Sequence, residues 1–293
     1  MTTALDNLLS ILDLEEIEVN TFRGRTPEEN RVRVFGGQVA GQALVAAGRT
    51  VEDRVVHSLH AYFLRAGDPS IPILYQVDRI RDGKSFTTRR VMAVQRGHAI
   101  FNLSASFQVP EEGVEHQATM PDAPDPDALP TFKTRVGPLL DKAPKEFRRW
   151  LERERPIDVR YVDGVDYLAP KKRPPNQLVW IRADGDLPDT PLIHQYVAAY
   201  ASDMTLLDTI TMPHGISSLD QRTYQMASLD HAMWFHRPFR ADQWLLYEQE
   251  SPAAAGSRGF TRGSLYTREG VLVASVAQEG LLRRRIGKPR GRV

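Results

Sequence analysis

The chain has 293 residues, which is long enough for two domains or one large one, and its composition is that of an ordinary globular protein. Its 38 basic and 37 acidic residues leave no overall field that would hold a polyanion, so nucleic acid is not an expected partner. The absence of cysteine excludes disulfides, thiolate metal sites and a cysteine nucleophile, in keeping with a reducing compartment.

The N-terminal segment predicts a short amphipathic helix. Leu5, Leu8, Leu9 and Leu12 recur at helical spacing. The same segment carries acids where a signal peptide needs basic residues, and no apolar run in the chain approaches the ~20 residues of a membrane span. We therefore expect a cytoplasmic protein without membrane insertion.

The first half of the chain predicts one helix followed by antiparallel strands. A stretch rich in alanine and glycine follows residues 34–38, and such small side chains suit a helix whose backbone closely approaches a neighbour. Residues 57–108 then contain strand-like stretches separated by glycine-containing turns. A helix lying on a curved antiparallel sheet would bury the apolar faces of both.

A second copy of this order follows a proline-rich segment. Prolines recur from Pro110 to Pro144, so neither a helix nor a central strand can run through most of this segment. Beyond it, strand-like stretches, a helix from Pro191 to about Thr209 and four more strand-like stretches repeat the first half. We predict an α+β protein with an N-terminal module, a linker and a C-terminal module at residues 1–115, 116–150 and 151–293.

One carboxylate lies on or beside the face of the second helix that should be buried. Thr190 is the expected N-cap of this helix and Pro191 its first residue. Asp203 falls at helical spacing between Tyr200 and Leu207. Burial without a partner would raise its pKa toward the range useful for a general base. The alternative is that Asp203 lies at the rim of the apolar stripe and bonds a nearby backbone group or arginine.

Two polar side chains on predicted strands are further candidates. Gln278 ends a row in which Leu272, Ala274 and Val276 share one side of the last strand. Ser228 opens the strand that runs into an aromatic cluster, and its hydroxyl can both donate and accept a hydrogen bond. Either residue alone is more often structural.

The two helices differ at the position of the carboxylate. Aligning them places Ala46 of the first helix where Asp203 stands in the second. Only one copy retains an acid, which predicts one active site per chain.

Six segments carry a resemblance to a known family: residues 34–38, 56–65, 202–203, 229–239, 258–260 and 276–280. They closely resemble the acyl-CoA thioesterase II family. They extend over nearly the whole chain, and the one that includes Trp234 and Phe235 is specific. The resemblance implies a double hot-dog fold, hydrolysis of fatty acyl-CoA, and assembly into homodimers or homotetramers.

The resemblance also implies a set of site residues. The family's site of Asp, Thr or Ser, and Gln falls on Asp203, Ser228 and Gln278. The family most often has threonine where Ser228 stands; serine keeps the hydroxyl but loses the methyl group that fixes its rotamer. His57 matches a histidine also proposed to matter in the family, although it lies in the other half of the chain.

Thioester hydrolysis by such a site requires neither a metal nor a cofactor. A thioester carbonyl is electrophilic, and a thiolate from a thiol of pKa about 8.5 leaves with little acid assistance, so one base and one held water suffice. We expect Asp203 to take a proton from water while Gln278 and Ser228 orient it. Backbone N–H groups would receive the developing oxyanion.

An acyl-CoA substrate also needs groups that meet its phosphates and its acyl chain. Trp234 and Phe235 are candidates for an apolar slot, although core packing is the commoner use of at least one of them. Arginines on strand-like stretches of both halves could pair with the phosphates, or could be plain surface charges. These arginines are Arg89, Arg90, Arg258 and Arg262.

Three other functions fit parts of the sequence less well. Asp189 and His194 imitate the acid and histidine of a hot-dog enoyl-CoA hydratase, but the flanking residues are absent and capping explains Thr190. Ser257 offers a near miss to a nucleophile elbow, but it leads into a strand and not a helix. The third is a non-catalytic acyl-CoA-binding protein, which the retention of a complete candidate site disfavours.

Overall fold

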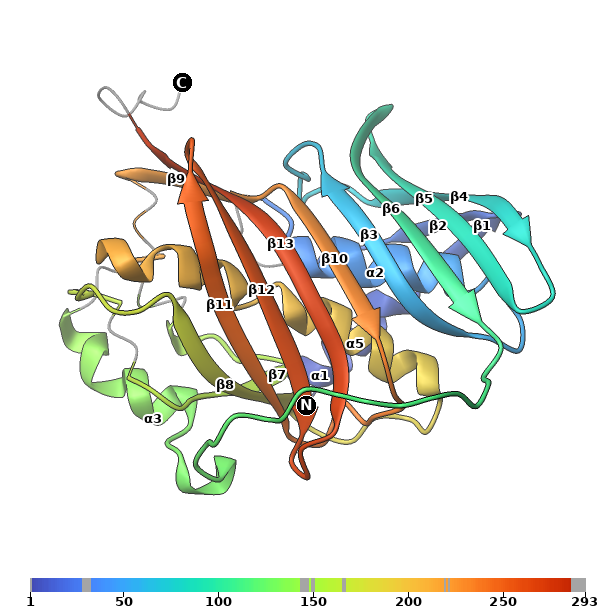
Figure 1. The fold of residues 1–293 in the computed structure, drawn as a ribbon. Coiled ribbons are helices and arrows are strands. Elements are labelled where there is room, and N and C mark those ends of the chain that lie inside the picture. Colours follow the sequence, from blue (N-terminus) through green and yellow to red (C-terminus); the bar gives the residue numbers. More distant parts are fainter. Residues whose placement is uncertain are drawn as a thin grey trace.

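One antiparallel sheet of thirteen strands runs through both halves of the chain (Figure 1). The computed structural model describes residues 2–27, 33–142, 148, 151–164, 167–218, 220 and 222–285. The strand order is β1-β2-β4-β5-β6-β3-β10-β13-β12-β11-β8-β7, with β9 paired to β13. The strands are β1 (Glu15–Glu18), β2 (Thr21–Gly24), β3 (Val55–Phe63), β4 (Ile73–Asp82), β5 (Phe86–Gln95), β6 (His98–Gln108), β7 (Ile157–Tyr161), β8 (Asn176–Ala183), β9 (Tyr224–Ser228), β10 (Asp230–Phe235), β11 (Leu245–Ala255), β12 (Arg258–Thr267) and β13 (Leu272–Arg284).

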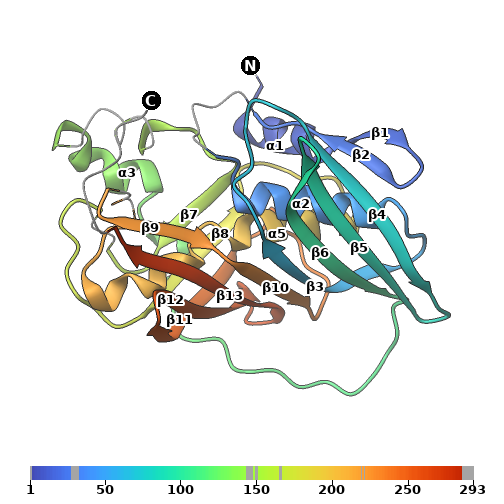
Figure 2. The same cartoon turned by 90° about the horizontal axis from the view of Figure 1, so that it is seen from above.

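Two long helices lie on the same side of this sheet (Figure 2). They are α2 (Gly36–Gly48) and α5 (Pro191–Ser202), and each half of the sheet curves around one of them. The predicted N-terminal helix is α1 (Ala4–Leu12), which buries three of its four leucines, Leu5, Leu8 and Leu12. This arrangement confirms the expected double hot-dog fold. No helix in the described part of the chain is long and apolar enough to cross a membrane.

The two halves meet at the centre of the sheet. Strands β3 and β10 pair antiparallel, from Asp230 opposite Tyr62 to Trp234 opposite Ser58. A single hydrophobic cluster contains buried residues of both helices and of strands on both sides of this seam. The modules therefore share one core, which fixes the position of each helix relative to the strands of the other module.

Helix α5 ends earlier than the sequence pattern predicted. It stops at Ser202, whose hydroxyl donates to the carbonyl of Ala199, and Asp203 is the C-cap. Two buried glutamines hold Thr205 outside helical geometry: Gln177 donates to its carbonyl and Gln249 to its hydroxyl. The chain continues as two 3₁₀ turns, η3 (Leu206–Ile210) and η4 (Met212–His214), so Asp203 projects from a helix end and not from a helical stripe.

The proline-rich segment is mostly irregular, as predicted, but it contains short helical pieces. These are η1 (Pro126–Ala128), α3 (Phe132–Val136) and η2 (Gly137–Lys142). The side-chain hydroxyl of Thr131 caps α3, which accounts for a helix between the prolines. The segment also contacts the second half of the sheet, since the indole of Trp180 donates to the carbonyl of Pro124. Residues 143–147 and 149–150 of the predicted linker, and residues 286–293 of the predicted C-terminal module, lie outside the described residues.

Two strand details differ from the sequence expectation. Ala274, Val276 and Gln278 are buried on one side of β13, but Leu272 packs in a separate cluster. The register between β12 and β13 shifts at this point, and the extra residue reverses the side to which Leu272 points. Ser228 does not open the strand with the aromatic cluster; it ends β9, and β10 begins two residues later.

Candidate active site

Asp203 lies where the C-terminal end of α5 meets the N-terminal end of α2. The helices pack so closely that a Cβ atom on Gly37 would lie 2.2 Å from the carbonyl oxygen of Tyr200. A Cβ atom on Gly36 would lie 2.5 Å from Oδ2 of Asp203. Glycine is therefore required at both positions. The backbone N–H of Gly37 donates to the Asp203 carboxylate, which also lies at the positive end of the α2 dipole.

Three side chains from three elements form a continuous hydrogen-bonded set around this carboxylate. The Ser228 hydroxyl donates to Oδ1 of Asp203 at 2.9 Å. Nε2 of Gln278 donates to the Ser228 hydroxyl at 2.9 Å. Ser228 reaches this position because it pairs with Gly280 on β13, two residues beyond Gln278. The structure thus brings together all three residues that the resemblance implied, from α5, β9 and β13.

The hydrogen-bonded set continues into the core through His231, which sequence reasoning did not select. Nδ1 of His231 lies 2.6 Å from Oε1 of Gln278, and Nε2 lies 2.9 Å from the hydroxyl of Ser202. Only 1% of His231 is exposed. A sequence signal was present, because His231, Met233 and Phe235 share one side of β10, and a histidine in a buried row needs partners.

The environment of Asp203 sets its protonation. Burial raises the pKa of the Asp203 carboxyl above its ordinary value. The positive charge of His231 opposes this rise, as do the hydrogen bonds from Ser228, Gln278 and the Gly37 backbone, all of which lower the same pKa. Asp203 as a residue is half-buried, and a carboxylate with a raised pKa is suited to accept a proton from water.

His57 lies apart from this set. Its Nε2 is 2.8 Å from the hydroxyl of Ser106, and its ring packs edge-on against Phe86. In the pairing of β3 with β10, the Ser228 end of β10 meets Tyr62, five residues along β3 from His57, or roughly 17 Å at the rise of an extended strand. Burial lowers the pKa of the His57 imidazole. Within one chain, the structure does not bring His57 to Asp203.

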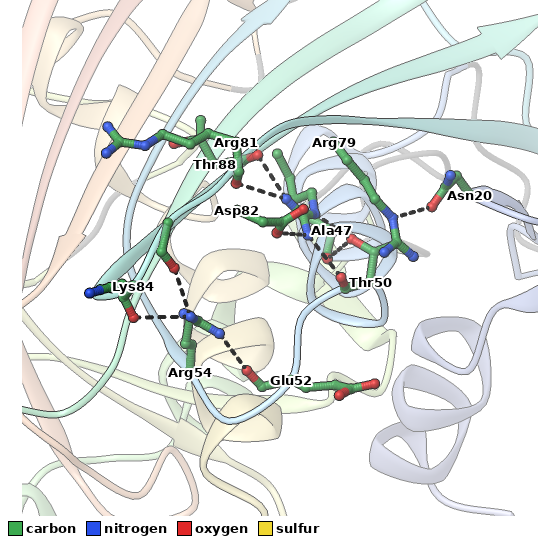
Figure 3. Close-up of polar contacts among 12 residues, drawn as sticks. Asn20, Ala47, Thr50, Glu52, Arg54, Arg79, Arg81, Asp82, Lys84 and Thr88 are labelled. Atoms are coloured by element: carbon green, nitrogen blue, oxygen red, sulfur yellow. Dashed lines mark hydrogen bonds and ion pairs between the residues drawn. The ribbon is translucent and has the colours of Figure 1, made fainter.

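Arg89 is a structural residue of the first module. The residue is 1% exposed, and its guanidinium donates to the hydroxyl and carbonyl of Thr50 and to the Asp82 carboxylate. The carbonyls of Arg81 and Thr88 accept two further bonds. Figure 3 shows these partners gathered where the end of α2 meets strands β4 and β5. With its donors engaged in this way, Arg89 has little capacity left for a phosphate.

The other three candidate arginines are exposed, and each is paired with an acid. Arg90 binds Asp78, Arg258 binds Glu279, and Arg262 binds Glu250. Such exposed pairs are weak, so a phosphate could compete for any of them. On β12, the residue opposite Gln278 is Thr261, which lies one residue from Arg262 and three residues from Arg258.

The two aromatic candidates face opposite sides of the sheet. Phe235 is 7% exposed and belongs to the shared core, where it stacks on Phe239. Trp234 is half-buried and packs edge-on against His60, an exposed residue of β3. Core packing therefore accounts for Phe235.

A second buried acid, Asp208, lies in the η3 turn. Burial raises the pKa of Asp208 to about 7, against the effects of a hydrogen bond from Ser218 and the charge of Arg173, which lower it. Two cavities of about 400 and 160 Å³ flank Asp208. Asp203, Ser228 and Gln278 are not among the residues that line them.

The residues that suggested other enzymes have structural roles. Asp189 forms an ion pair with Arg240, while Nδ1 of His194 accepts from the backbone N–H of Ala241. Ser257 has a φ of 63° in the turn between β11 and β12, so no helix follows it. Neither arrangement forms a second catalytic constellation.

Comparison with known proteins finds relatives over nearly the whole chain. Models described as the acyl-CoA thioesterase N-terminal domain and acyl-CoA thioesterase match residues 26–108 and 152–281. Acyl-coenzyme A thioesterase 8 of Homo sapiens is 44% identical, over 94% of this chain and 88% of that protein. Acyl-CoA thioesterase 2 of Haemophilus influenzae is 38% identical, over 97% and 99%. The crystal structure of an acyl-CoA thioesterase II from Mycobacterium marinum is 45% identical, covers 97% of this chain and 99% of its own, and superposes with a TM-score of 0.78.

Proposed function

The chain belongs to the acyl-CoA thioesterase II family and is an acyl-CoA thioester hydrolase, and we propose that it cleaves fatty acyl-CoA with a water molecule activated by Asp203. The observation that carries this mechanism is the hydrogen-bonded set of Asp203, Ser228 and Gln278 at the junction of the two helices. It joins one base, whose pKa is raised by burial, to a hydroxyl that can hold a water and to an amide that directs this hydroxyl.

The proposed reaction begins with general-base catalysis. Asp203 removes a proton from the water as its oxygen attacks the thioester carbonyl carbon. Ser228 has hydrogen-bonding capacity beyond its bonds to Asp203 and Gln278, and it holds the water in line for attack. Gln278 is fully buried, so it acts by directing the Ser228 hydroxyl and not, as expected from the sequence, by orienting the water itself. Asp203 needs only to be deprotonated at the start, which the Ser228, Gln278 and Gly37 donors favour.

The tetrahedral intermediate places a negative charge on the former carbonyl oxygen. The N-terminal end of α2 lies beside Asp203, and the N–H of Gly37 in its first turn donates to that carboxylate. We assign the stabilisation of this oxyanion to that helix end. Collapse of the intermediate then expels the CoA thiolate, which needs little acid assistance because its conjugate acid has a pKa of about 8.5.

Serine at position 228 retains the function that the mechanism requires. Its hydroxyl both accepts from Gln278 and donates to Asp203, which is all that the geometry asks of a threonine there. The missing methyl group removes one constraint on the rotamer, but the two bonds on opposite sides of the hydroxyl supply another.

We further propose that the protein is cytoplasmic and forms homodimers or homotetramers.

Release of free thiol from palmitoyl-CoA, followed with a thiol reagent, tests the activity directly. We expect stoichiometric thiol and free fatty acid. Loss of the crotonyl-CoA absorbance without thiol release would instead identify a hydratase. Binding of palmitoyl-CoA without turnover would identify a non-catalytic acyl-CoA-binding protein.

A further inference from the structure

The hydrogen bonds around His231 have a single consistent direction. Gln278 donates through Nε2 to Ser228, so the atom of its amide that faces His231 is the acceptor Oε1. The facing atom of His231, Nδ1, must therefore carry a proton. Ser228, which accepts from Gln278, is left to donate its own proton to Asp203. Each bond sets the direction of the next.

We propose that His231 is a positioning residue for the hydrolysis: its Nδ1–H fixes the orientation of the Gln278 amide, and thereby directs the Ser228 hydroxyl proton onto Asp203. This inference rests on the proposed function of Asp203 as the base. His231 does not contact the carboxylate itself, and it acts through two intervening side chains. Its own position is held by Ser202, the last residue of α5, and therefore by the element that ends at Asp203.

The alternative orientation of the Gln278 amide explains why this control matters. If the amide turned over, Oε1 would face Ser228 and compete with Asp203 for the hydroxyl proton. Asp203 would then lose the Ser228 donor, and its pKa would rise further because burial would be less compensated. The Nδ1–H of His231 prevents this, since a turned amide would place two donors against each other.

The buried setting makes the His231 bond hard to replace with water. Gln278 is 0% exposed and Ser202 is 0% exposed. The hydroxyl of Tyr247 donates to the carbonyl of Ser202 and closes the other side of the cluster. A lost donor at position 231 would therefore leave Oε1 of Gln278 without a partner.

Two substitutions separate this role from simple packing. His231→Asn places the amide nitrogen Nδ2 the same number of bonds from the backbone as Nδ1 of histidine, so this variant preserves the donor to Gln278. His231→Gln places its amide nitrogen near the former Nε2, so it preserves the partner of Ser202 and loses the donor to Gln278. Glutamine is closer to histidine in size. A purely structural role would therefore favour His231→Gln, whereas the proposed role favours His231→Asn.

The measurements are kcat, KM and the pH dependence of kcat/KM for palmitoyl-CoA hydrolysis. We expect His231→Gln and His231→Leu to lower kcat on the order of 10- to 100-fold, the range found when the group that orients a functional residue is removed. KM should change little. The acid limb of the pH profile should move to higher pH in all three His231 variants, because each loses the positive charge that lowers the pKa of Asp203, so kcat at the pH optimum is the readout that separates them. His231→Asn should restore most of kcat, and His236→Leu, which removes an exposed imidazole bound to Ser275, should match the parent enzyme.

A double-mutant cycle supplies the decisive comparison. In a Gln278→Met background there is no amide to orient, so adding His231→Leu should have almost no further effect on kcat. The proposal would be overturned if His231→Leu lowered kcat by the same factor in the parent and in the Gln278→Met background. It would also be overturned if His231→Gln were more active than His231→Asn. If Asp203→Asn is inactive while every His231 variant turns over normally, the base assignment stands and only the role of His231 fails. If Asp203→Asn is active, the proposed mechanism itself fails.

Discussion

Asp203 and Asp208 lie five residues apart on the same segment, and burial raises the pKa of both. Their surroundings differ. Asp203 receives bonds from Ser228, from Gln278 and from the first turn of a helix in the other module. Asp208 has one hydroxyl partner, Ser218, and a nearby cation. A raised pKa therefore indicates only that an acid is buried. Several hydrogen-bond donors and a helix N-terminus directed at the carboxylate, as at Asp203, are what distinguish a catalytic base.

Short of replacing Asp203 itself, crowding its carboxylate should produce the largest change in kcat. In Gly36→Ala, the new Cβ would lie 2.5 Å from Oδ2 of Asp203 and 2.9 Å from the ring of Phe63. Because displacement of a catalytic group by about 1 Å can cost around 100-fold, we expect a loss of about that size in kcat. Steady-state kinetics check this, with Gly113→Ala as the control, because a Cβ there meets no atom within 4 Å. Normal turnover in Gly36→Ala would place the reacting group elsewhere.

Removing one donor to Asp203 should have an intermediate effect. In Ser228→Ala the carboxylate loses its hydroxyl donor, and a hydrogen bond to a charged group is worth about 1.5–3 kcal/mol, so we expect kcat to fall roughly 10- to 100-fold. Ser228→Thr keeps the hydroxyl and should retain near-parent activity. The acid limb of the pH dependence of kcat/KM should move to higher pH in the alanine variant only. A threonine variant as slow as the alanine variant would contradict this account of the hydroxyl.

Replacing the second acid should affect stability and leave turnover nearly unchanged. The folded-state pKa of Asp208 is about 7, well above its ordinary value of 3.8, so the folded chain binds this proton more tightly than the unfolded chain. The contribution of Asp208 to stability is therefore fully present below about pH 4 and is lost as the pH rises through 7. Asp208→Asn removes this loss of stability at high pH. Each 1 kcal/mol that the variant gains in free energy of unfolding at pH 8 would raise Tm by roughly 2–4 °C.

Thermal melts of the parent and Asp208→Asn at pH 5 and pH 8 measure that difference. We expect the variant to gain relative to the parent at the higher pH. A large loss of kcat in Asp208→Asn would show that the two acids share a function, and the comparison between them would fail.

Much of this organisation was predictable from the chain. The repeated order of helix and strands indicated two modules, and the fold follows from covering each half of the sheet with one helix. The residues of the candidate site came from the family resemblance, and the structure brings Asp203, Ser228 and Gln278 within hydrogen-bonding distance. Local patterns placed Asp203 in a buried environment, but they could not distinguish a helical stripe from a helix end.

The remaining features depend on contacts between distant segments. The end of α5 is set by Gln177 and Gln249, which belong to strands far from it in sequence. The need for glycine at position 36 arises from Asp203 across the module junction. The burial of Arg89 depends on partners in α2's following turn and in β4, which no periodicity of β5 reveals. The alternation of β10 indicates that His231 is buried, but the sequence does not reveal its partner Gln278, which the pairing of β10 with β13 brings beside it.

The most direct test is to compare Asp203→Asn with Asp208→Asn in palmitoyl-CoA hydrolysis, with circular dichroism and KM confirming that both variants fold and bind substrate. The account predicts that Asp203→Asn lowers kcat on the order of 10²- to 10⁴-fold, the contribution of a general base, while Asp208→Asn turns over like the parent. Near-parent turnover in a folded Asp203→Asn protein would contradict the account.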